Sequence, residues 1–285
     1  MDQRHLRFWA FLLLFALLFS SLTACEPPQG DPAAGEGALP PMEVVVFSIG
    51  KADAILLYGE MGAVLIDTGE VEDGSEVLSF LRKKGITRLD ALFLTHYDKD
   101  HVGGAADIIR GVEISAVYGT YPSKESEEYD AYLSALAEKG LTPTVLREEL
   151  TLSLDKLMLT VYPPKKTAYE QKTSNNSSLA IHATYGEHGF FFAGDAEEER
   201  IAELLEIEGI ACDFLKAPYH GNMLENFPAL LSHLKPRYAA LTCSDKNPED
   251  AEKSAALRAA GTEILLSRTG NIYARSDGKT LTVRH

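Results

Sequence analysis

The chain has 285 residues, of which 45% are hydrophobic, and a formal net charge of −15. A chain of this length and composition can bury a large core, which excludes a disordered protein. Its acidic surface argues against a protein that coats nucleic acid nonspecifically. Charges more than about 8 Å apart are largely screened at physiological salt, so phosphate binding inside a local metal site stays open.

The first residues have the features of a secretory signal peptide. A short basic start precedes an apolar run from Phe8 to Phe19, and small residues follow it. This run is too short to cross a hydrocarbon layer of about 30 Å comfortably, so we expect cleavage. Residues 22–25 resemble the lipobox of bacterial lipoproteins, in which the cysteine is lipid-modified; the alternative is an ordinary signal peptide that ends near a cysteine. We predict a lipoprotein signal peptide over 1–24 and lipidation of Cys25.

A flexible linker and then a folded domain are expected after Cys25. Residues 25–41 are rich in Pro, Gly and Ala and lack apolar periodicity, which is typical of a spacer. The folded domain is predicted over 42–285, and the mature chain would carry a formal charge of −16. We expect it at the extracytoplasmic face of the cell membrane, held there by its lipid anchor, with no protein partner predicted.

Strands and helices follow in a pattern typical of an α/β domain. Residues 42–69 contain three apolar runs with Gly-containing turns, which predicts an antiparallel meander. A helix is expected over 74–85, with Gly85 at its C-terminal end, and from the strand at 89–94 onward strands and helices alternate. The hairpin predicted over 178–195 begins a second half of similar plan. Two sheets packed face to face with helices outside are therefore expected.

The stretch THYDKDHVGG, residues 95–104, concentrates potential metal ligands on a loop between a strand and a helix. Unpaired carboxylates at such a position are costly to desolvate, and a divalent cation removes that cost. The alternative is a solvated acidic loop with incidental histidines. We favour a metal site whose candidate ligands include His96, Asp98, Asp100 and His101.

Three further polar residues end apolar strands: Asp67 in AVLIDTG, Asp195 in FFFAGD and His220 in LKAPYHG. If the C-terminal ends of these strands share one edge of the sheets, the polar residues gather there, which is where α/β sheets hold their sites.

In this order, the motifs resemble those of the metallo-β-lactamase superfamily. THYDKDHVGG is similar to its H-x-H-x-D-H-x-G-G signature, with Asp98 in place of the second histidine. The closest likeness is to the hydrolase-like domain of ComEC-type DNA-uptake proteins, carried also by VFSIGKADAILL, LIDTG, NNSSLAI, FFFAGDAE and DFLKAPYHGN. It covers almost all of 42–285. The fold that it implies is an αββα sandwich of two mixed sheets with outer helices.

The resemblance also implies two divalent metal ions. Zinc is the usual ion of the superfamily, and manganese is a serious alternative because the ligands are rich in oxygen. The implied ligands are His96 and Asp98 for the first ion, Asp100, His101 and His220 for the second, and Asp195 as the bridge.

The first of these ions lacks one usual ligand. Family members have another histidine shortly before the GD strand, where this chain has residues 175–178, NNSS. We therefore expect a weaker first site. His182, on an alternating strand, is interpreted as a packing or surface residue, and His188, in a predicted hairpin turn, as solvated.

Other residues are assigned to the surroundings of the metals or to substrate. Asp67 would orient loop residues by hydrogen bonds, its alternative being a simple turn residue. Tyr219 and Asn222 replace a histidine and a serine common in the ComEC-like branch. Lys51 and Lys216 would contact phosphate or lie at the surface. The residues assigned to second-layer or substrate contacts are Asp67, Asn176, Ser178, Tyr219 and Asn222.

Cys212 and Cys243 remain once Cys25 is assigned to lipid. Cys212 opens one expected strand and Cys243 closes the next, so parallel neighbours would hold the two sulfurs too far apart to bond. We expect two free, mostly buried thiols.

The function expected from these features is that of an extracytoplasmic, membrane-anchored, metal-dependent hydrolase. A phosphodiesterase or nuclease-like enzyme is favoured, in which hydroxide held by the metals attacks an anionic phosphodiester, with DNA as a candidate substrate. Asp100 or Asp195 would accept a proton. The alternatives are a hydrolase of a small ester, lactam or cell-wall component, and a non-catalytic metal-binding interaction module.

Overall fold

The computed structural model describes residues 37–123 and 125–285. The predicted signal peptide, Cys25 and most of the predicted linker lie outside these ranges. Residues from Ala38 to His285 form one compact unit. Within the described ranges, no helix has both the length and the apolar character needed to cross a membrane.

The first sheet begins with the predicted meander and continues with parallel strands. β1, β2 and β3 pair antiparallel, whereas β3, β5, β7 and β8 are parallel. Its eight strands stand in the order β17 (Leu281–Arg284), β16 (Ile272–Ser276), β1 (Met42–Val46), β2 (Ile55–Gly59), β3 (Gly62–Ile66), β5 (Ala91–Leu94), β7 (Val117–Gly119) and β8 (Thr144–Val145).

The second sheet is also mixed. β9 to β12 pair antiparallel, and β12 to β15 are parallel. A separate parallel pair joins β4 (Arg88–Leu89) and β6 (Glu113–Ile114). The seven strands of the second sheet stand in the order β15 (Glu263–Leu266), β14 (Tyr238–Leu241), β13 (Phe214–Lys216), β12 (His188–Phe192), β11 (Ala180–Tyr185), β10 (Leu157–Tyr162) and β9 (Leu150–Leu154).

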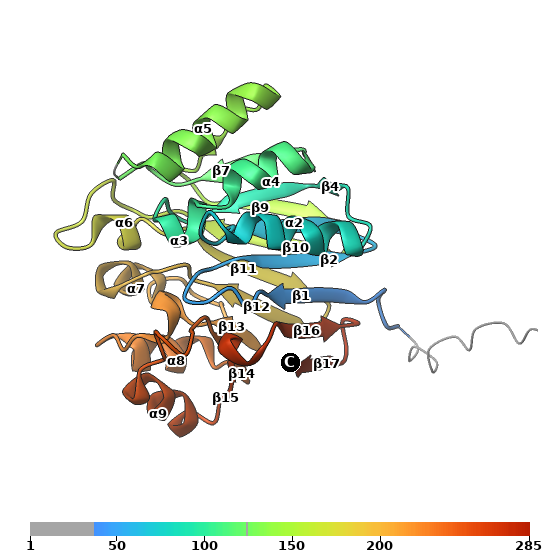
Figure 1. The fold of residues 1–285 in the computed structure, drawn as a ribbon. Helices are drawn as coiled ribbons and strands as arrows, with labels where there is room; N and C mark the ends of the chain where they lie inside the picture. The colour runs from blue at the N-terminus through green and yellow to red at the C-terminus, as the bar shows by residue number, and fades with distance from the viewer. Residues whose placement is uncertain (1–36, 124) are drawn as a thin grey trace, which may run out of the picture. The chain divides into compact units, whose positions relative to one another are not determined.

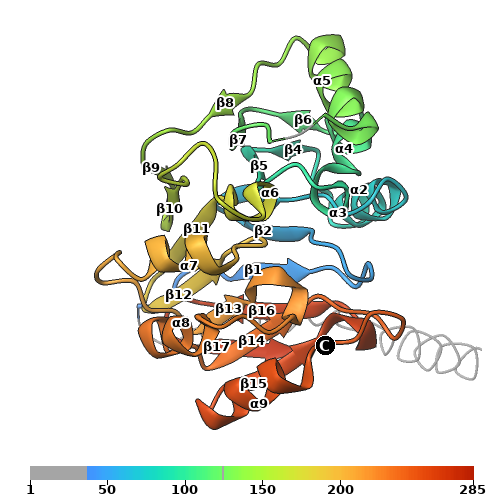
Figure 2. The same cartoon turned by 90° about the vertical axis from the view of Figure 1, so that its left-hand side faces the viewer.

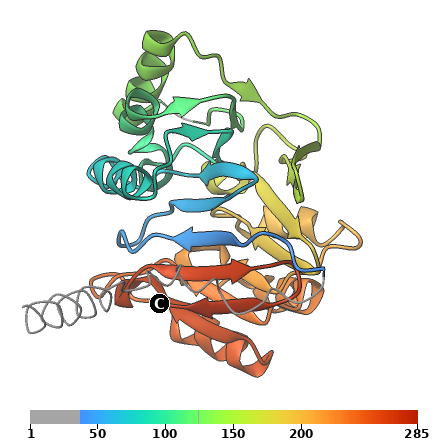
Figure 3. The same cartoon turned by 90° about the vertical axis from the view of Figure 1, so that its right-hand side faces the viewer.

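Helices cover the outer face of each sheet, which confirms the predicted αββα sandwich (Figure 1). Figure 3 shows the layers of the sandwich from one edge, opposite to the edge that faces the viewer in Figure 2. Three helices pack on the first sheet: α2 (Asp73–Lys83), α4 (Ala105–Gly111) and α5 (Glu127–Lys139). Three pack on the second: α7 (Glu198–Leu204), α8 (Phe227–Leu234) and α9 (Ala251–Ala259). The short helices are α3 (Lys99–Val102), α6 (Thr173–Asn176), η1 (Pro218–Gly221) and η2 (Ser267–Thr269).

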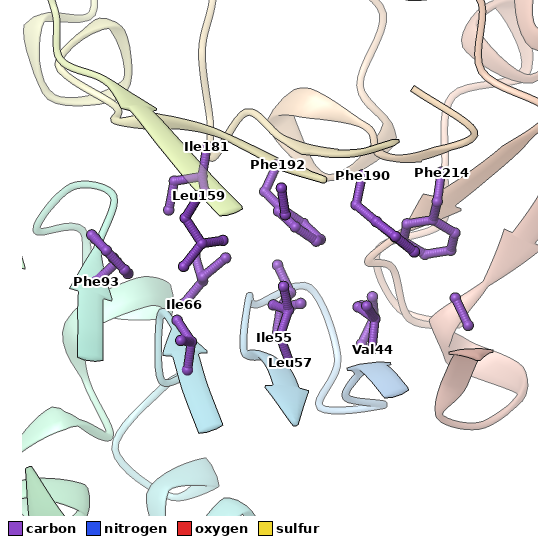
Figure 4. Close-up of a cluster of buried hydrophobic side chains, with 14 of the residues drawn as sticks. Val44, Ile55, Leu57, Ile66, Phe93, Leu159, Ile181, Phe190, Phe192 and Phe214 are labelled. Carbon is purple, nitrogen blue, oxygen red and sulfur yellow. The ribbon is translucent and has the colours of Figure 1, made fainter. Parts of the chain in front are cut away.

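The alternation of side chains along the strands builds three apolar layers. In β1, Val44 points between the sheets and Val45 points toward the helices. Between the sheets, Val44, Ile55 and Ile66 of the first sheet face aromatic and aliphatic side chains of the second, as Figure 4 shows. Burial of this apolar area, at roughly 25 cal/mol per Å², is the main force that holds the sheets together.

The parallel strands of both sheets end at one edge of the sandwich. Asp67 follows β3, the 95–104 loop follows β5, Asp195 follows β12, and His220 follows β13. Figure 2 looks toward this edge, where α3, α6 and α7 gather.

Several local expectations can be checked. Cys212 and Cys243 are free and buried, and β13 and β14 are parallel neighbours, as predicted. The interpretation of His188 as solvated is wrong, because this residue begins β12, is 7% exposed and has Nδ1 2.8 Å from Ser276 Oγ. The stretch 95–104, predicted as a loop before a helix, contains the short helix α3, and the next helix, α4, begins only at Ala105, after Gly103 and Gly104. A Cβ at Gly104 would lie 2.3 Å from the Thr68 carbonyl oxygen, so glycine permits this close approach.

Candidate metal centre

His101 is a fully buried imidazole whose orientation is set by Asp67. His101 Nδ1 lies 2.8 Å from Asp67 Oδ2, and both the backbone N–H and the hydroxyl of Thr68 donate to the His101 carbonyl at 2.8 Å. A carboxylate partner keeps the proton on Nδ1 and leaves the Nε2 lone pair free to bind a cation. Asp67, with φ of 57°, thus has the orienting contact that the sequence suggested.

His96 is oriented by the same carboxylate through a threonine. Thr95 donates its hydroxyl to Asp67 Oδ2 at 2.7 Å and its backbone N–H to Asp67 Oδ1 at 2.7 Å. Since the Thr95 hydroxyl proton is committed to Asp67, its oxygen can accept from His96 Nδ1, 3.2 Å away. His96 Nε2 is buried and, within the described residues, has no hydrogen-bond partner.

His220 repeats this arrangement on the second sheet. Its Nδ1 lies 2.9 Å from Thr242 Oγ1, and the Thr242 hydroxyl donates to Asp53 Oδ1 at 2.7 Å. The imidazole is presented by an unusual turn in which Tyr219 and His220 both have positive φ, 55° and 54°. Such conformations are costly for residues with a Cβ and occur where surrounding contacts impose them.

The free sides of the imidazoles converge with two carboxylates. His220 Nε2 lies 3.0 Å from Asp195 Oδ2, 3.3 Å from Asp100 Oδ2 and 3.3 Å from His101 Nε2. His101 Nε2 is 3.4 Å from Asp195 Oδ1. Asp98 Oδ2 lies 4.0 Å from His96 Nε2, at the other end of the group. The structure therefore brings all six sequence-predicted ligands to one edge.

Lys216 and Asp53 form a fully buried ion pair behind this group. The Lys216 ammonium contacts Asp53 Oδ2 closely, donates to the Gly194 carbonyl at 3.1 Å and lies 3.6 Å from Asp195 Oδ1. The two expectations for Lys216, phosphate contact or a surface position, are both wrong, because its side chain is 0% exposed. A lysine this deep is tolerated since carboxylates surround it.

Asp53 itself is close enough to join a metal site. Its carboxylate, with His101, Asp195 and His220, offers ligand atoms that all lie within 4.8 Å of one another. Its Oδ1 nevertheless accepts from the Thr242 hydroxyl and lies 3.3 Å from His220 Nδ1, on the side of the ring that faces away from the centre. We therefore interpret Asp53 as a residue that orients His220 from behind.

The histidines and carboxylates of the group stabilise each other's charged forms. Burial acts to lower the pKa of His220, but the Asp195 and Asp53 carboxylates raise it to about 10. Burial acts to raise the pKa of Asp195, and His220 and His101 nevertheless hold it well below its usual range. The carboxylates thus attract positive charge to the centre of the group.

The residues present fit divalent metal ions. Two buried atoms that face the centre, His96 Nε2 and Asp195 Oδ1, have no hydrogen-bond partner in the described part of the chain. Imidazole nitrogen and carboxylate oxygen are the ligands that zinc and other divalent ions use, and carboxylates behind metal-binding histidines are common.

The other sequence-predicted residues surround the centre in different ways. Ser178 Oγ lies 3.4 Å from His96 Nδ1 and accepts from the Asp195 backbone N–H at 3.1 Å. Asn176 is 2% exposed and accepts, through Oδ1, from the backbone N–H groups of Glu197 and Arg200. Its amide is therefore used to begin α7.

Tyr219, Asn222 and His182, also considered from the sequence, make other contacts. The Tyr219 ring centre lies 5.5 Å from Lys51 Nζ. Asn222 closes the turn after His220, where its N–H donates to the Tyr219 carbonyl at 2.9 Å. His182 Nε2 lies 3.1 Å from the Ala211 carbonyl, a packing contact on β11 as the sequence indicated.

Sequence reasoning missed Asp53, Thr95 and Thr242, which orient the proposed ligands, and gave Lys216 a different role. A signal was present in each case, since Asp53 and Lys216 are charged residues inside apolar runs, and Thr95 and Thr242 follow strands. Ser174, which donates to Asp98 Oδ1 from α6, was also missed.

Comparison with known proteins agrees with this geometry. The family description "Metallo-beta-lactamase superfamily" matches residues 49–241. The chain therefore belongs to the metallo-β-lactamase superfamily, which at the family level supports a metal-dependent hydrolase.

Within this superfamily the chain is ComEC-like. It is 28% identical over 224 residues to ComE operon protein 3 of Bacillus subtilis, an alignment that covers 72% of this chain and 29% of that protein. It is 24% identical over 217 residues to Recombination protein 2 of Haemophilus influenzae, covering 73% of this chain and 25% of that protein. The chain thus spans less than a third of the length of these curated relatives.

Solved structures share the fold. The metallo-beta-lactamase fold protein YhfI from Bacillus subtilis has a TM-score of 0.58 at 14% identity, covering 86% of this chain and 100% of that chain. A mutant of CmlA beta-hydroxylase has a TM-score of 0.52 at 14% identity, covering 83% and 53%.

Proposed function

We propose that this chain is a metal-dependent phosphodiesterase or nuclease-like enzyme that works at the edge described above. The observation that carries the proposal is the convergence of His96, His101, His220, Asp100 and Asp195, with three imidazoles backed on their Nδ1 sides. Sites whose ligands are oriented in advance in this way are typical of metalloenzymes.

The proposed ligands divide between two ions. His96 and Asp98 would hold one ion, Asp100, His101 and His220 the other, and Asp195 would serve both. Zinc and manganese are both compatible with these ligands. Divalent ions bound there would supply Lewis-acid polarisation of the substrate and would acidify water.

Asp100 and Asp195 are proposed to have different roles. The Asp195 side chain is 5% exposed, contacts His220 at 3.0 Å and lies beside Lys216, so it is suited to hold metal. The Asp100 side chain is 22% exposed, so a water molecule or a leaving group can reach it. We therefore assign proton acceptance to Asp100.

An anionic phosphodiester is the proposed substrate class. Lys51 stands beside Tyr219, the residue before His220, and can meet a phosphate that enters from this side. The similarity to ComE operon protein 3 and Recombination protein 2 supports a DNA-related substrate. An oxygen-rich ligand set also suits phosphate chemistry.

The location proposed is the extracytoplasmic face of the membrane, with a lipid anchor on Cys25. The support is the basic, apolar and small-residue pattern of residues 1–25. Loss of membrane partitioning in Cys25→Ala, measured by fractionation, is the expected result. Retention of this variant in the membrane fraction would refute lipidation as the cause of anchoring.

The substrate class is tested with metal-loaded protein on matched substrates. Hydrolysis of bis-p-nitrophenyl phosphate and single-stranded DNA should exceed that of p-nitrophenyl acetate and a chromogenic lactam, with zinc and manganese tried separately. Preference for the ester or lactam would favour the small-substrate alternative. Metal binding without turnover of any of them would favour a non-catalytic metal-binding module.

A further inference from the structure

The turn that presents His220 has a positive φ at three successive residues. Tyr219, His220 and Gly221 have φ of 55°, 54° and 100°. Two of them carry a Cβ, for which left-handed conformations are disfavoured, so contacts outside the turn must hold it in place.

A buried lysine from a distant helix contacts both ends of this turn. Lys253, on α9, is 0% exposed, and its amino group donates to the carbonyl oxygens of Pro218 and Asn222, the latter at 2.8 Å. Pro218 precedes the three residues with positive φ and Asn222 follows them. A single amino group thus joins the two sides of the turn.

One further contact ties the same helix to the turn, and another joins its lysine to α8. The backbone N–H of Asp250, where α9 begins, donates to the Gly221 carbonyl at 3.0 Å. Lys253 Nζ also lies 4.2 Å from the centre of the Phe227 ring on α8, so the amino group packs against this ring as well. The amino group therefore has partners on three sides and little freedom to move.

Lys253 is unusual for its surroundings, since α9 packs on the second sheet through apolar residues such as Leu257. An apolar side chain at position 253 would fit this layer but would leave two buried carbonyl groups without their donor. The contacts with the turn, rather than the packing of α9, therefore explain why position 253 holds a lysine.

We propose that Lys253 is a positioning residue that clamps the strained turn and so holds the His220 imidazole in its metal-facing orientation. This inference rests on the proposed function in one respect, namely that His220 binds metal. The clamp itself belongs to the metal-free fold and can be tested there.

The metal-dependent test compares Lys253→Met with Arg258→Met in the full chain. The first change removes the amino group at nearly constant volume, and the second removes an exposed cation from the same helix. Calorimetric titration with Zn²⁺ should show affinity reduced about 10- to 100-fold in Lys253→Met and unchanged in Arg258→Met, as for other changes behind metal ligands. Lys253→Gln, which keeps an amide NH₂ group as a donor, should lose less.

The metal-free test follows the His220 ring resonances by NMR in the presence of a chelator. These signals should shift or broaden in Lys253→Met and Lys253→Gln, and should stay unchanged in Arg258→Met. If Lys253→Met does not fold, Lys253→Gln decides the question. A folded variant with unchanged His220 signals would overturn the clamp. Altered His220 signals with unchanged zinc affinity would support the clamp and refute His220 as a metal ligand.

Discussion

Asp67 is the residue on which two of the three metal-facing histidines depend. It accepts from His101 Nδ1 directly and stands behind His96 through the Thr95 hydroxyl. A single buried carboxylate thus sets the orientation of two rings whose centres are 4.0 Å apart. Because such contacts determine which nitrogen carries the proton, their loss should weaken metal binding without removing any ligand.

Thr95→Val tests this arrangement at constant volume. The change removes the hydroxyl between His96 and Asp67, so zinc affinity should fall about tenfold. It also leaves buried polar groups unpaired, which should reduce the free energy of unfolding by about 1–3 kcal/mol. Titration calorimetry and urea denaturation measure the two effects. Thr95→Ser keeps the hydroxyl and should bind zinc nearly as the unchanged protein does, so equal affinity of all three proteins would contradict this account.

Lys216→Met tests the buried ion pair with Asp53. Removing the lysine leaves the Asp53 carboxylate uncompensated, and the free energy of unfolding should fall by about 3–5 kcal/mol. Burial acts to raise the pKa of Asp53, and Lys216 is the largest influence that lowers it, which is why the effect should be large. Urea denaturation in the presence of a chelator measures it.

The matched control is the double change Asp53→Asn with Lys216→Met. It removes both charges, so much of the lost stability should return. A double variant that is as unstable as Lys216→Met alone would show that the lysine acts through some other contact.

At this scale the sequence predicted which residues gather at the edge better than it predicted the residues that support them. His96, Asp98, Asp100 and His101 stand within one short loop, so their spacing alone indicated a site. Asp53 and Thr242 are 189 residues apart and meet only because the two sheets pack together. Contacts of this kind depend on tertiary packing, which local pattern does not contain.

Among the elements, α7 has an unusual beginning. The side chain of its N-cap residue, Glu197, makes no capping hydrogen bond, and Asn176 of α6 supplies the acceptor instead, through bonds from Glu197 N at 3.2 Å and Arg200 N at 3.1 Å. Asp195 lies just before this helix. The position of a proposed metal ligand is thereby coupled to a cap that comes from a different segment.

Asn176→Ala should destabilise the protein through this cap. The loss of the acceptor leaves two N–H groups at the start of α7 unpaired, those of Glu197 and Arg200, which should cost about 1–2 kcal/mol. Thermal denaturation measures the loss. Asn176→Asp keeps an acceptor oxygen at a helix N-terminus and should retain most of the stability, so equal losses in both variants would argue against capping as the cause.

Regular elements were predicted well where local pattern decides them. The meander of β1 to β3 and helix α2 follow from apolar periodicity and turn residues. His188 was misplaced because the glycine at position 186 suggested a longer turn, whereas β12 begins at His188 itself. The break between α3 and α4 is set by the approach of Gly104 to Thr68, a tertiary contact.

For the whole molecule, metal binding and stability should be linked. The centre joins the ends of strands from both sheets, so a ligand that binds only the folded state stabilises the sandwich. At a free metal concentration 100 times the dissociation constant, the stabilisation is about 2.7 kcal/mol. For a domain of this size the melting temperature should rise by about 5–10 °C.

Scanning calorimetry with and without a chelator measures this rise. Asp195→Asn weakens a proposed ligand that contacts both His101 and His220. The rise in melting temperature on metal addition should therefore be much smaller in this variant. An equal shift in this variant would place the stabilising metal elsewhere, for example on the acidic surface that gives the chain its charge of −15.

The central claim is that this edge of the sandwich is a hydrolytic metal centre. The most direct test is the rate of bis-p-nitrophenyl phosphate hydrolysis by metal-loaded protein, compared with Asp195→Asn at the same metal content. We predict that the unchanged protein hydrolyses this substrate and that the rate of the variant is lower by at least about 100-fold. A loss of this size is expected when a group that organises the reacting centre is removed. No hydrolysis by the fully loaded protein, or equal rates in the two proteins, would contradict it.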